Sequence, residues 1–210
     1  MLAGRFPGPL WGWGWFRVSP LLCSGRMSMK KHQGTFIALL RGINVGGHNK
    51  IPMPELRSVS AELGWGEVQT YIQSGNLVFT AGAAPSALEA ELERAIERRF
   101  GLLIPVIVRA ATDWPAYVKS NPFPDVCEKE PNLVMLGLSK SPPKADTEMR
   151  LQERAAPGER IVRVSDALWI HFGSGMARTK LSPALLDRLA GSPVTMRNWR
   201  TVLKLGELAG

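Results

Sequence analysis

Apolar residues recur at regular spacings from residue 35 onward, and strand-like and helix-like periods alternate along the chain. Short runs of β-branched and aromatic residues indicate strands, whereas Leu or Ile at every third or fourth position indicates an amphipathic helix. Leu88, Leu92, Ile96 and Phe100 are one such helical series, and Gly101 follows as a stop signal. The pattern predicts a strand, a helix, two strands joined by a tight turn, a helix, a strand and a short helix, at residues 35–40, 54–63, 68–72, 77–80, 86–100, 104–108 and 114–119.

The same order of elements returns after residues 120–131, a segment rich in Pro, Asp, Glu and Asn that predicts a linker. Matching apolar positions support a repeat, because Leu39 precedes Leu136 by 97 residues and Phe79 precedes Phe172 by 93. We therefore predict an α+β fold formed by tandem duplication of a ferredoxin-like βαββαβ unit, with antiparallel sheets backed by helices. One continuous mixed sheet is the alternative. The second set of elements is expected at residues 133–138, 144–155, 161–164, 168–172, 182–190, 194–196 and 199–208.

Residues 1–34 show neither period and contain Trp11, Trp13 and Trp15 alternating with glycine. We expect either a disordered leader or a start placed upstream of the natural one, near Met29. A Trp-rich anchor that touches a membrane surface is the alternative. The first α+β half is then expected at residues 35–122 and the second at 130–210.

Composition excludes several classes of protein. Cys23 and Cys127 are the only cysteines, which argues against a disulfide framework or a cysteine-based zinc site and favours a cytoplasmic protein. No apolar run reaches the roughly 18 residues of a membrane-spanning helix, so we expect no membrane partner. We also expect no metal and no cofactor, because His48 and His171 are the only histidines outside the leader.

The net charge of +8 is unevenly distributed along the chain. Residues 1–34 contribute +5, residues 35–170 contribute −1, and residues 171–210 contribute +4. The positive charge that concerns the folded part is therefore C-terminal, and it suggests a nucleotide or nucleic acid as a possible partner.

The connection between the first strand and the first helix is the first candidate binding segment. It spans the 12 residues 41–52, where two to six would be usual. Glycines, asparagines and cations in this arrangement could form a nest of backbone N–H groups for a phosphate or carboxylate. The spacing fits neither G-x-G-x-x-G nor GxxxxGK[ST], and the alternative is that Gly42, Gly46 and Gly47 only supply positive φ angles. The candidate ligand-binding residues here are Arg41, Asn44, Gly46, Gly47, His48, Asn49 and Lys50.

The hairpin of the first half is the second candidate segment, with Gln73, Ser74 and Asn76 gathered at its turn. Side chains 71, 73, 77 and 79 could form one face of the sheet. Tyr71 and Phe79 could stack nucleic-acid bases there, but aromatic residues on such a face usually belong to the core. The sequence pattern typical of an RRM is lacking.

The C-terminal segment is the third candidate. A helix at 198–208, capped by Asn198, would turn Val202 and Leu205 to the core. Its polar face could bind a phosphate backbone or simply be solvated. That face would hold Arg197, Arg200, Thr201 and Lys204, and the candidate ligand-binding residues of the whole segment are Arg178, Lys180, Arg197, Asn198 and Lys204.

Residues for catalysis are few. Cys127 has no base next to it in the sequence, and strand alternation places His171 on the surface of a sheet, opposite Ile170 and Phe172. His48 is the better candidate for an acid or base; it lies in the connection at residues 41–52, which we call the glycine loop.

Four segments resemble a bacterial family known as domain of unknown function 1697. They are LLRGINVGGHNKIPMPEL, VQTYIQSGNLVF, Asn121-Pro122-Phe123 and TMRNWRTVLKLGELA, so the resemblance spans roughly residues 35–209. It implies a cytosolic α+β protein built from two related halves. It implies no activity, cofactor or catalytic residue.

Three hypotheses about function follow. The first is a protein that binds the phosphate of a nucleotide or nucleic acid through the loop at 41–50 and the basic C-terminal segment. The second is an enzyme that acts on a small phosphorylated or carboxylated substrate in a cleft between the halves. The third is a protein-interaction module. The sequence predicts neither a reaction nor an oligomeric state.

Overall fold

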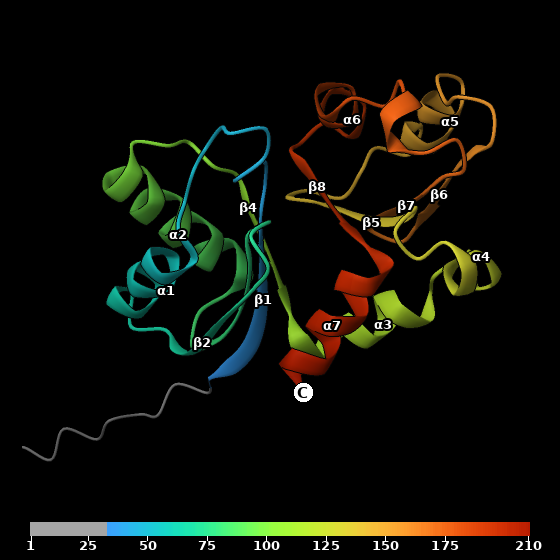
Figure 1. Ribbon diagram of the computed structural model, residues 1–210. Coiled ribbons are helices and arrows are strands. Elements are labelled where there is room, and N and C mark those ends of the chain that lie inside the picture. The colour runs from blue at the N-terminus through green and yellow to red at the C-terminus, as the bar shows by residue number, and fades with distance from the viewer. Residues whose placement is uncertain (1–32) are drawn as a thin grey trace, which may run out of the picture. The chain divides into compact units, whose positions relative to one another are not determined.

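The computed structural model describes residues 33–210, which form two four-stranded antiparallel sheets backed by helices (Figure 1). The expected α+β class is therefore confirmed, and the alternative of one continuous mixed sheet is wrong. The predicted leader at residues 1–34 lies outside the described residues except for its last two.

The first sheet is built from the first four strands, in the order β2-β3-β1-β4. Every neighbouring pair runs antiparallel. Its elements are β1 (Gly34–Leu40), α1 (Met53–Glu62), β2 (Gly66–Tyr71), β3 (Asn76–Ala81), α2 (Pro85–Phe100), β4 (Val106–Ala110) and α3 (Trp114–Lys119).

The second sheet has the order β6-β7-β5-β8, again with antiparallel neighbours throughout. The predicted linker at 120–131 contains a short helix instead, because Phe123 and Cys127 are buried and anchor it. The elements are α4 (Pro124–Lys129), β5 (Val134–Ser139), α5 (Thr147–Gln152), β6 (Glu159–Val164), β7 (Ala167–Phe172), α6 (Pro183–Ala190), β8 (Val194–Asn198) and α7 (Trp199–Ala209).

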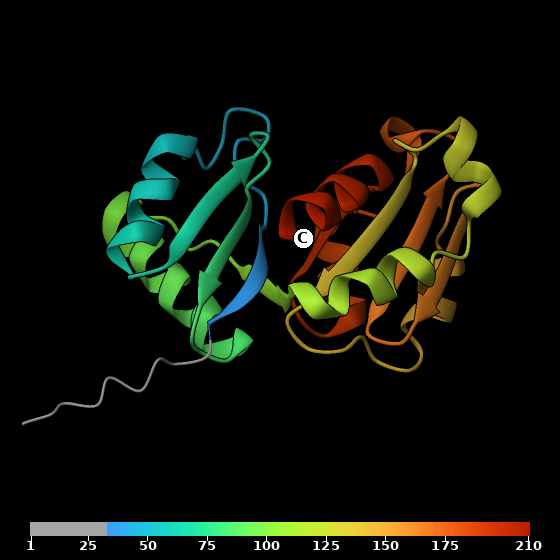
Figure 2. The same cartoon turned by 90° about the horizontal axis from the view of Figure 1, so that it is seen from below.

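Helices cover both faces of each sheet, so the described residues pack into three hydrophobic cores (Figures 1 and 2). Helices α1 and α2 pack on one face of the first sheet, and α5 and α6 pack on one face of the second. The remaining faces share a central core with α3 and α7. Strand β1 consequently sends Phe36 to one core and Ile37 to the other, which explains why it is apolar at successive positions.

The expected sharing of one sheet face by residues 71, 73, 77 and 79 is wrong. Tyr71 pairs directly with Asn76, so its side chain lies on the same face as Val78. Phe79 points to the opposite face, where it is fully buried and stacks on Trp65 with ring centroids 3.9 Å apart. Phe79 is therefore a core residue and cannot stack a base.

The turn between β2 and β3 requires glycine at position 75. Gly75 has a φ of 75°, and an added Cβ would lie 2.6 Å from Cδ1 of Ile43 and 2.8 Å from Cβ of Leu40. We expect Gly75→Ala to lower the free energy of unfolding by about 2–3 kcal/mol, since a left-handed conformation is costly for residues with a Cβ and the new methyl group would crowd Ile43 and Leu40. Urea denaturation would measure this. Gly64→Ala, at a φ of 80° with open space around it, is the control for the dihedral cost alone.

Candidate functional site

A groove of about 480 Å³ brings together parts of all three candidate segments. The glycine loop, the hairpin turn and the strand β8 with the start of α7 each contribute to its wall. Small-ligand sites commonly have volumes of roughly 300–1,000 Å³, so this groove could hold such a ligand. We call it the loop–β8 groove; it is lined by Arg41, Gly42, Ile43, Val45, Ile72, Ser74, Met135, Met176, Pro183, Leu186, Val194, Thr195, Met196, Arg197, Asn198 and Thr201.

The amide side chains of the glycine loop hold the loop itself in place. Asn44 donates from Nδ2 to the carbonyls of Ile51 (3.0 Å) and Gln73 (2.9 Å), and its Oδ1 accepts from the N–H of Ile51. Asn49 donates to the carbonyl of Gly42. The bond to Gln73 ties the loop to the hairpin turn and the others close the loop on itself, so the two asparagines maintain the shape of the site.

The glycines of this loop do have the expected positive φ angles, at 67° for Gly42, 58° for Gly46 and 82° for Gly47. His48 and Lys50 are exposed on the loop and form no ion pair with any described residue. They do not line the loop–β8 groove. Lys50, Gly47 and Gln73 border a neighbouring hollow of about 350 Å³ instead.

Arg197 lies in strand β8 and is only 6% exposed, so its expected place on a polar helix face is wrong. Every nitrogen of its guanidinium donates to oxygen atoms of the protein. Nε donates to Oδ1 of Asn76, and Nη1 donates to Oγ1 of Thr195 at 2.8 Å. The remaining acceptors are the carbonyls of Met196, Leu40, Ser74 and Gly75, at 2.8–3.1 Å.

All of these acceptors are neutral, and Arg197 has no carboxylate partner among the described residues. Burial alone lowers the pKa of Arg197 to about 10, which still leaves it charged at neutral pH. A buried charge without a counter-charge is costly, so its presence in the wall of a groove is unusual.

Arg109 occupies the same position in the first sheet that Arg197 occupies in the second. Each is the fourth residue of its five-residue strand, β4 or β8. Nη2 of Arg109 donates to the carbonyl of Ser139, the last residue of β5, at 2.7 Å. Nη2 of Arg197 donates to the carbonyl of Leu40, the last residue of β1, at 2.8 Å. Each arginine thus joins its own sheet to the other one.

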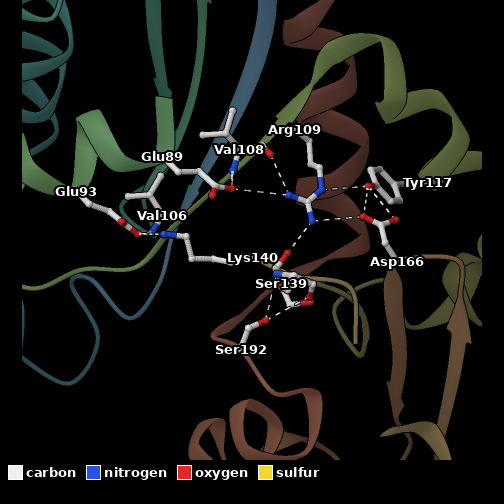
Figure 3. Close-up of polar contacts among 11 residues, drawn as sticks. Glu89, Glu93, Val106, Val108, Arg109, Tyr117, Ser139, Lys140, Asp166 and Ser192 are labelled. Carbon is white, nitrogen blue, oxygen red and sulfur yellow. Dashed lines mark hydrogen bonds and ion pairs between the residues drawn. The ribbon is translucent and has the colours of Figure 1, made fainter. Parts of the chain in front are cut away.

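Arg109 differs from Arg197 in having carboxylates around it (Figure 3). Nη2 of Arg109 lies 3.3 Å from Asp166, and Nη1 lies 3.9 Å from Glu89. Tyr117 accepts from Nε of Arg109 and donates to Asp166. Burial raises the pKa of Glu89 above its ordinary value and raises that of Tyr117 to about 12. The charge of Arg109 is therefore neutralised within the protein.

Two further ion pairs join the sheets at matching positions. Arg41, directly after β1, contacts Asp187 of α6 at 2.7 Å, and that carboxylate also accepts from the N–H of Val194. Lys140, directly after β5, contacts Glu93 of α2 at 2.6 Å, and Glu93 accepts from the N–H of Val106 (Figure 3). Arg41 lines the groove, but Asp187 already compensates its charge.

The other C-terminal candidates are dispersed. Asn198 caps α7 as expected, because its side chain accepts from the N–H of Thr201. Thr201 is buried, so its expected exposure on a polar helix face is wrong. Lys204 does not line the groove and pairs with Glu207 at 2.9 Å, a hydrogen bond that raises the pKa of Lys204.

Arg178 and Lys180 are exposed and do not line the groove. They belong to the segment between Met176 and Pro183, two residues that line it. Neither cation forms an ion pair with a described residue.

Three large apolar side chains in the groove wall are well exposed: Val45 at 64%, Ile72 at 50% and Met176 at 46%. Sequence reasoning did not single them out. Ile72 also has a φ of 49°, a conformation that is unusual for a β-branched residue.

Groups for acid–base or metal chemistry lie elsewhere. His171 is buried and not on an open sheet surface, because Phe123 packs beside it and Nε2 lies 3.3 Å from Glu130. Cys127 is a free, buried thiol whose pKa is raised by burial. Residues 33–210 contain no cluster of three or more His, Cys, Asp or Glu suited to a metal ion. Within the same residues, no helix is long and apolar enough to span a membrane.

Comparisons with known proteins place the chain in a family. The conserved bacterial protein SP0830 from Streptococcus pneumoniae has a similar structure, with a TM-score of 0.65 and 23% sequence identity over 85% of this chain and 99% of that one. This likeness concerns the fold alone. No curated protein matches the chain. The model of the family described as protein of unknown function (DUF1697) matches residues 34–169, which confirms the resemblance noted in the sequence. The chain therefore belongs to the DUF1697 family.

Proposed function

We propose that the protein binds a small anionic ligand in the loop–β8 groove. The observation that carries this proposal is the charge of Arg197, which is buried in the groove wall with six neutral acceptors and no carboxylate. A bound anion would supply the missing counter-charge. Because all its N–H groups are already used, Arg197 acts through its charge, and direct hydrogen bonds come from other groups.

Groups able to donate those bonds border the groove. The side chains of Asn198 and Ser74 line it, as does the start of α7, whose helix dipole favours negative charge. Arg178 and Lys180 add exposed positive charge on the segment between Met176 and Pro183, two residues of the groove wall. Any phosphate or carboxylate fits this arrangement, including the phosphate of a nucleotide or a nucleic acid.

A comparison of the two halves also supports the loop–β8 groove as the binding site. The matching positions of Arg109 and Arg197, and of Arg41 and Lys140, favour a tandem duplication of a ferredoxin-like unit. In such a duplication, a feature found in one half alone is a candidate for function. The halves differ in two such features. The connection after β1 has 12 residues, whereas the connection after β5 has seven. Among the described residues, carboxylates lie close to Arg109 but pair with no nitrogen of Arg197.

The residue types that line the loop–β8 groove favour binding over catalysis. No described residue of the groove wall is a carboxylate, an imidazole or a thiol, so the wall offers no group for general acid–base work near neutral pH. We propose the cytoplasm as the compartment, since a free cysteine such as Cys127 is typical of reducing conditions.

The proposal is tested with anilinonaphthalene sulfonate, a fluorescent probe that combines an anion with an apolar part. Its affinity for the full chain should fall when salt is raised from about 50 to about 200 mM, because the attraction between charges is screened. The double variant Arg178→Glu/Lys180→Glu should weaken binding roughly three- to tenfold. Labelled single-stranded RNA and a fluorescent ATP analogue, added in separate titrations, test nucleic acid and nucleotide.

Lys119→Glu/Lys129→Glu is the matched control, because it also reverses two charges. Both lysines are exposed, on α3 and α4, and neither lines the groove, so this double reversal should leave the affinity unchanged. An affinity that responds neither to salt nor to the reversal of Arg178 and Lys180 would exclude a role for charge and overturn the proposal.

A further inference from the structure

The lining of the loop–β8 groove restricts the chemistry of the ligand beyond its charge. Among the described residues, the wall contains no aromatic ring and no carboxylate. Proteins recognise nucleobases by stacking them on aromatic rings and by hydrogen bonds to their edges. Here most of the wall is aliphatic instead, and Val45, Ile72 and Met176 are its well-exposed apolar side chains.

Methionines give this wall an adaptable surface. Met135, Met176 and Met196 contribute unbranched, polarisable side chains, which can fit apolar ligands of varied shape. Met176 is well exposed, and with Val45 and Ile72 it leaves an apolar surface that a bound alkyl chain would remove from water.

Ile72 is held at this surface at a cost to the backbone. Its φ of 49° is unfavourable for a side chain branched at Cβ, whereas Asn or Gly would adopt it readily. A turn selected for stability alone would carry one of those residues. Strain of this kind is typical of functional positions, and here it presents an aliphatic side chain to the groove.

We propose that the ligand is a soluble aliphatic carboxylate, whose alkyl chain lies against Val45, Ile72 and Met176 and whose carboxylate approaches the charge of Arg197. This assignment rests on the anion binding proposed above and names its ligand class. The charge of the groove wall is complementary to a carboxylate, and the aliphatic surface is complementary to the chain.

Isothermal titration calorimetry on the full chain tests the assignment with four separate probes. Decanoate, used below the concentration at which it forms micelles, carries both the chain and the charge. Acetate carries the charge without the chain, and decanol carries the chain without the charge. A fluorescent ATP analogue carries anionic charge with an aromatic base. We expect decanoate to bind at least tenfold more tightly than each of the others, since both parts of the ligand contribute.

A variant of the strained residue gives a second readout. Ile72→Asn suits the left-handed backbone and removes the aliphatic contact, so it should leave the protein folded and weaken decanoate binding roughly tenfold. Leu103→Asn is the matched control, because Leu103 is exposed but lies outside this groove. That variant should bind decanoate like the unmodified chain.

The outcomes separate the two proposals. If the ATP analogue binds with the salt dependence of an anion and decanoate does not, the ligand class is overturned while anion binding stands. If acetate binds as tightly as decanoate, the chain makes no contribution and the ligand class is again overturned. If no anion binds, both proposals fail. Binding to phosphatidylglycerol vesicles without binding to soluble decanoate would replace the soluble ligand by a membrane lipid.

Discussion

Arg197→Met is expected to lower the free energy of unfolding by about 3–5 kcal/mol, a larger loss than Gly75→Ala should cause. Methionine has a similar length but no donors. The carbonyls of Leu40, Ser74 and Gly75 and the amide oxygen of Asn76 would each lose a hydrogen bond. A buried acceptor left without a partner costs about 1–3 kcal/mol, and several are affected at once.

Part of this cost is offset, because the substitution also removes a buried charge that has no counter-charge. Denaturation by urea, followed by tryptophan fluorescence, would measure the loss. Arg150→Met is a suitable control, since Arg150 is partly exposed and its guanidinium pairs only with Asp146, the residue before α5. A loss below about 1 kcal/mol for Arg197→Met would show that water replaces the guanidinium, and that Arg197 does not hold the two sheets together.

The regular part of the fold could be predicted from hydrophobic periodicity. The spacing of apolar residues within an element such as α2 or β3 is enough to identify it as a helix or a strand. The repeated order of elements indicates two similar halves. Burial of both faces of the sheets could not be predicted, because it depends on where α3 and α7 pack. The side-chain direction of Tyr71 was also out of reach, since a hairpin register that pairs it with Asn76 is set by the turn and not by strand alternation alone.

The sequence predicts which segments meet at the candidate site, but not which of their side chains are free to bind a ligand. The glycine loop, the hairpin turn and β8 do meet, but Asn44, Asn49 and Asn76 bond to the protein itself. Arg109 was missed because the predicted strand ended at residue 108. The repeat itself indicates the equivalence of Arg109 and Arg197, because each is the fourth residue of matching strands with the sequences VIVRA and VTMRN. Their different charge surroundings follow from three-dimensional packing, which periodicity does not contain.

That difference between the two arginines leads to the last prediction. Asn76→Asp places a carboxylate beside Nε of Arg197 and so gives it the kind of partner that Asp166 is for Arg109. If a bound anion supplies the counter-charge of Arg197, an internal carboxylate should compete with it. We expect the affinity for anilinonaphthalene sulfonate to fall roughly 10- to 100-fold, the range for two like charges several ångströms apart in a partly buried site.

A second variant at position 76 distinguishes the effect of charge from damage to the fold. Aspartate at position 76 loses the donor that Asn76 offers to the carbonyl of Tyr71, so stability must be measured alongside affinity. Asn76→Ala removes the same amide donors without adding a charge, so it should keep most of the affinity if the charge of Asn76→Asp is the cause. An equal loss of affinity in both variants would mean that the turn is misfolded. Asp166→Asn alters the charge around Arg109 without touching the groove wall and should leave the affinity unchanged. If Asn76→Asp and the unmodified chain bound the probe with equal affinity, the charge of Arg197 would make no contribution to anion binding. That result would overturn the proposed anion site.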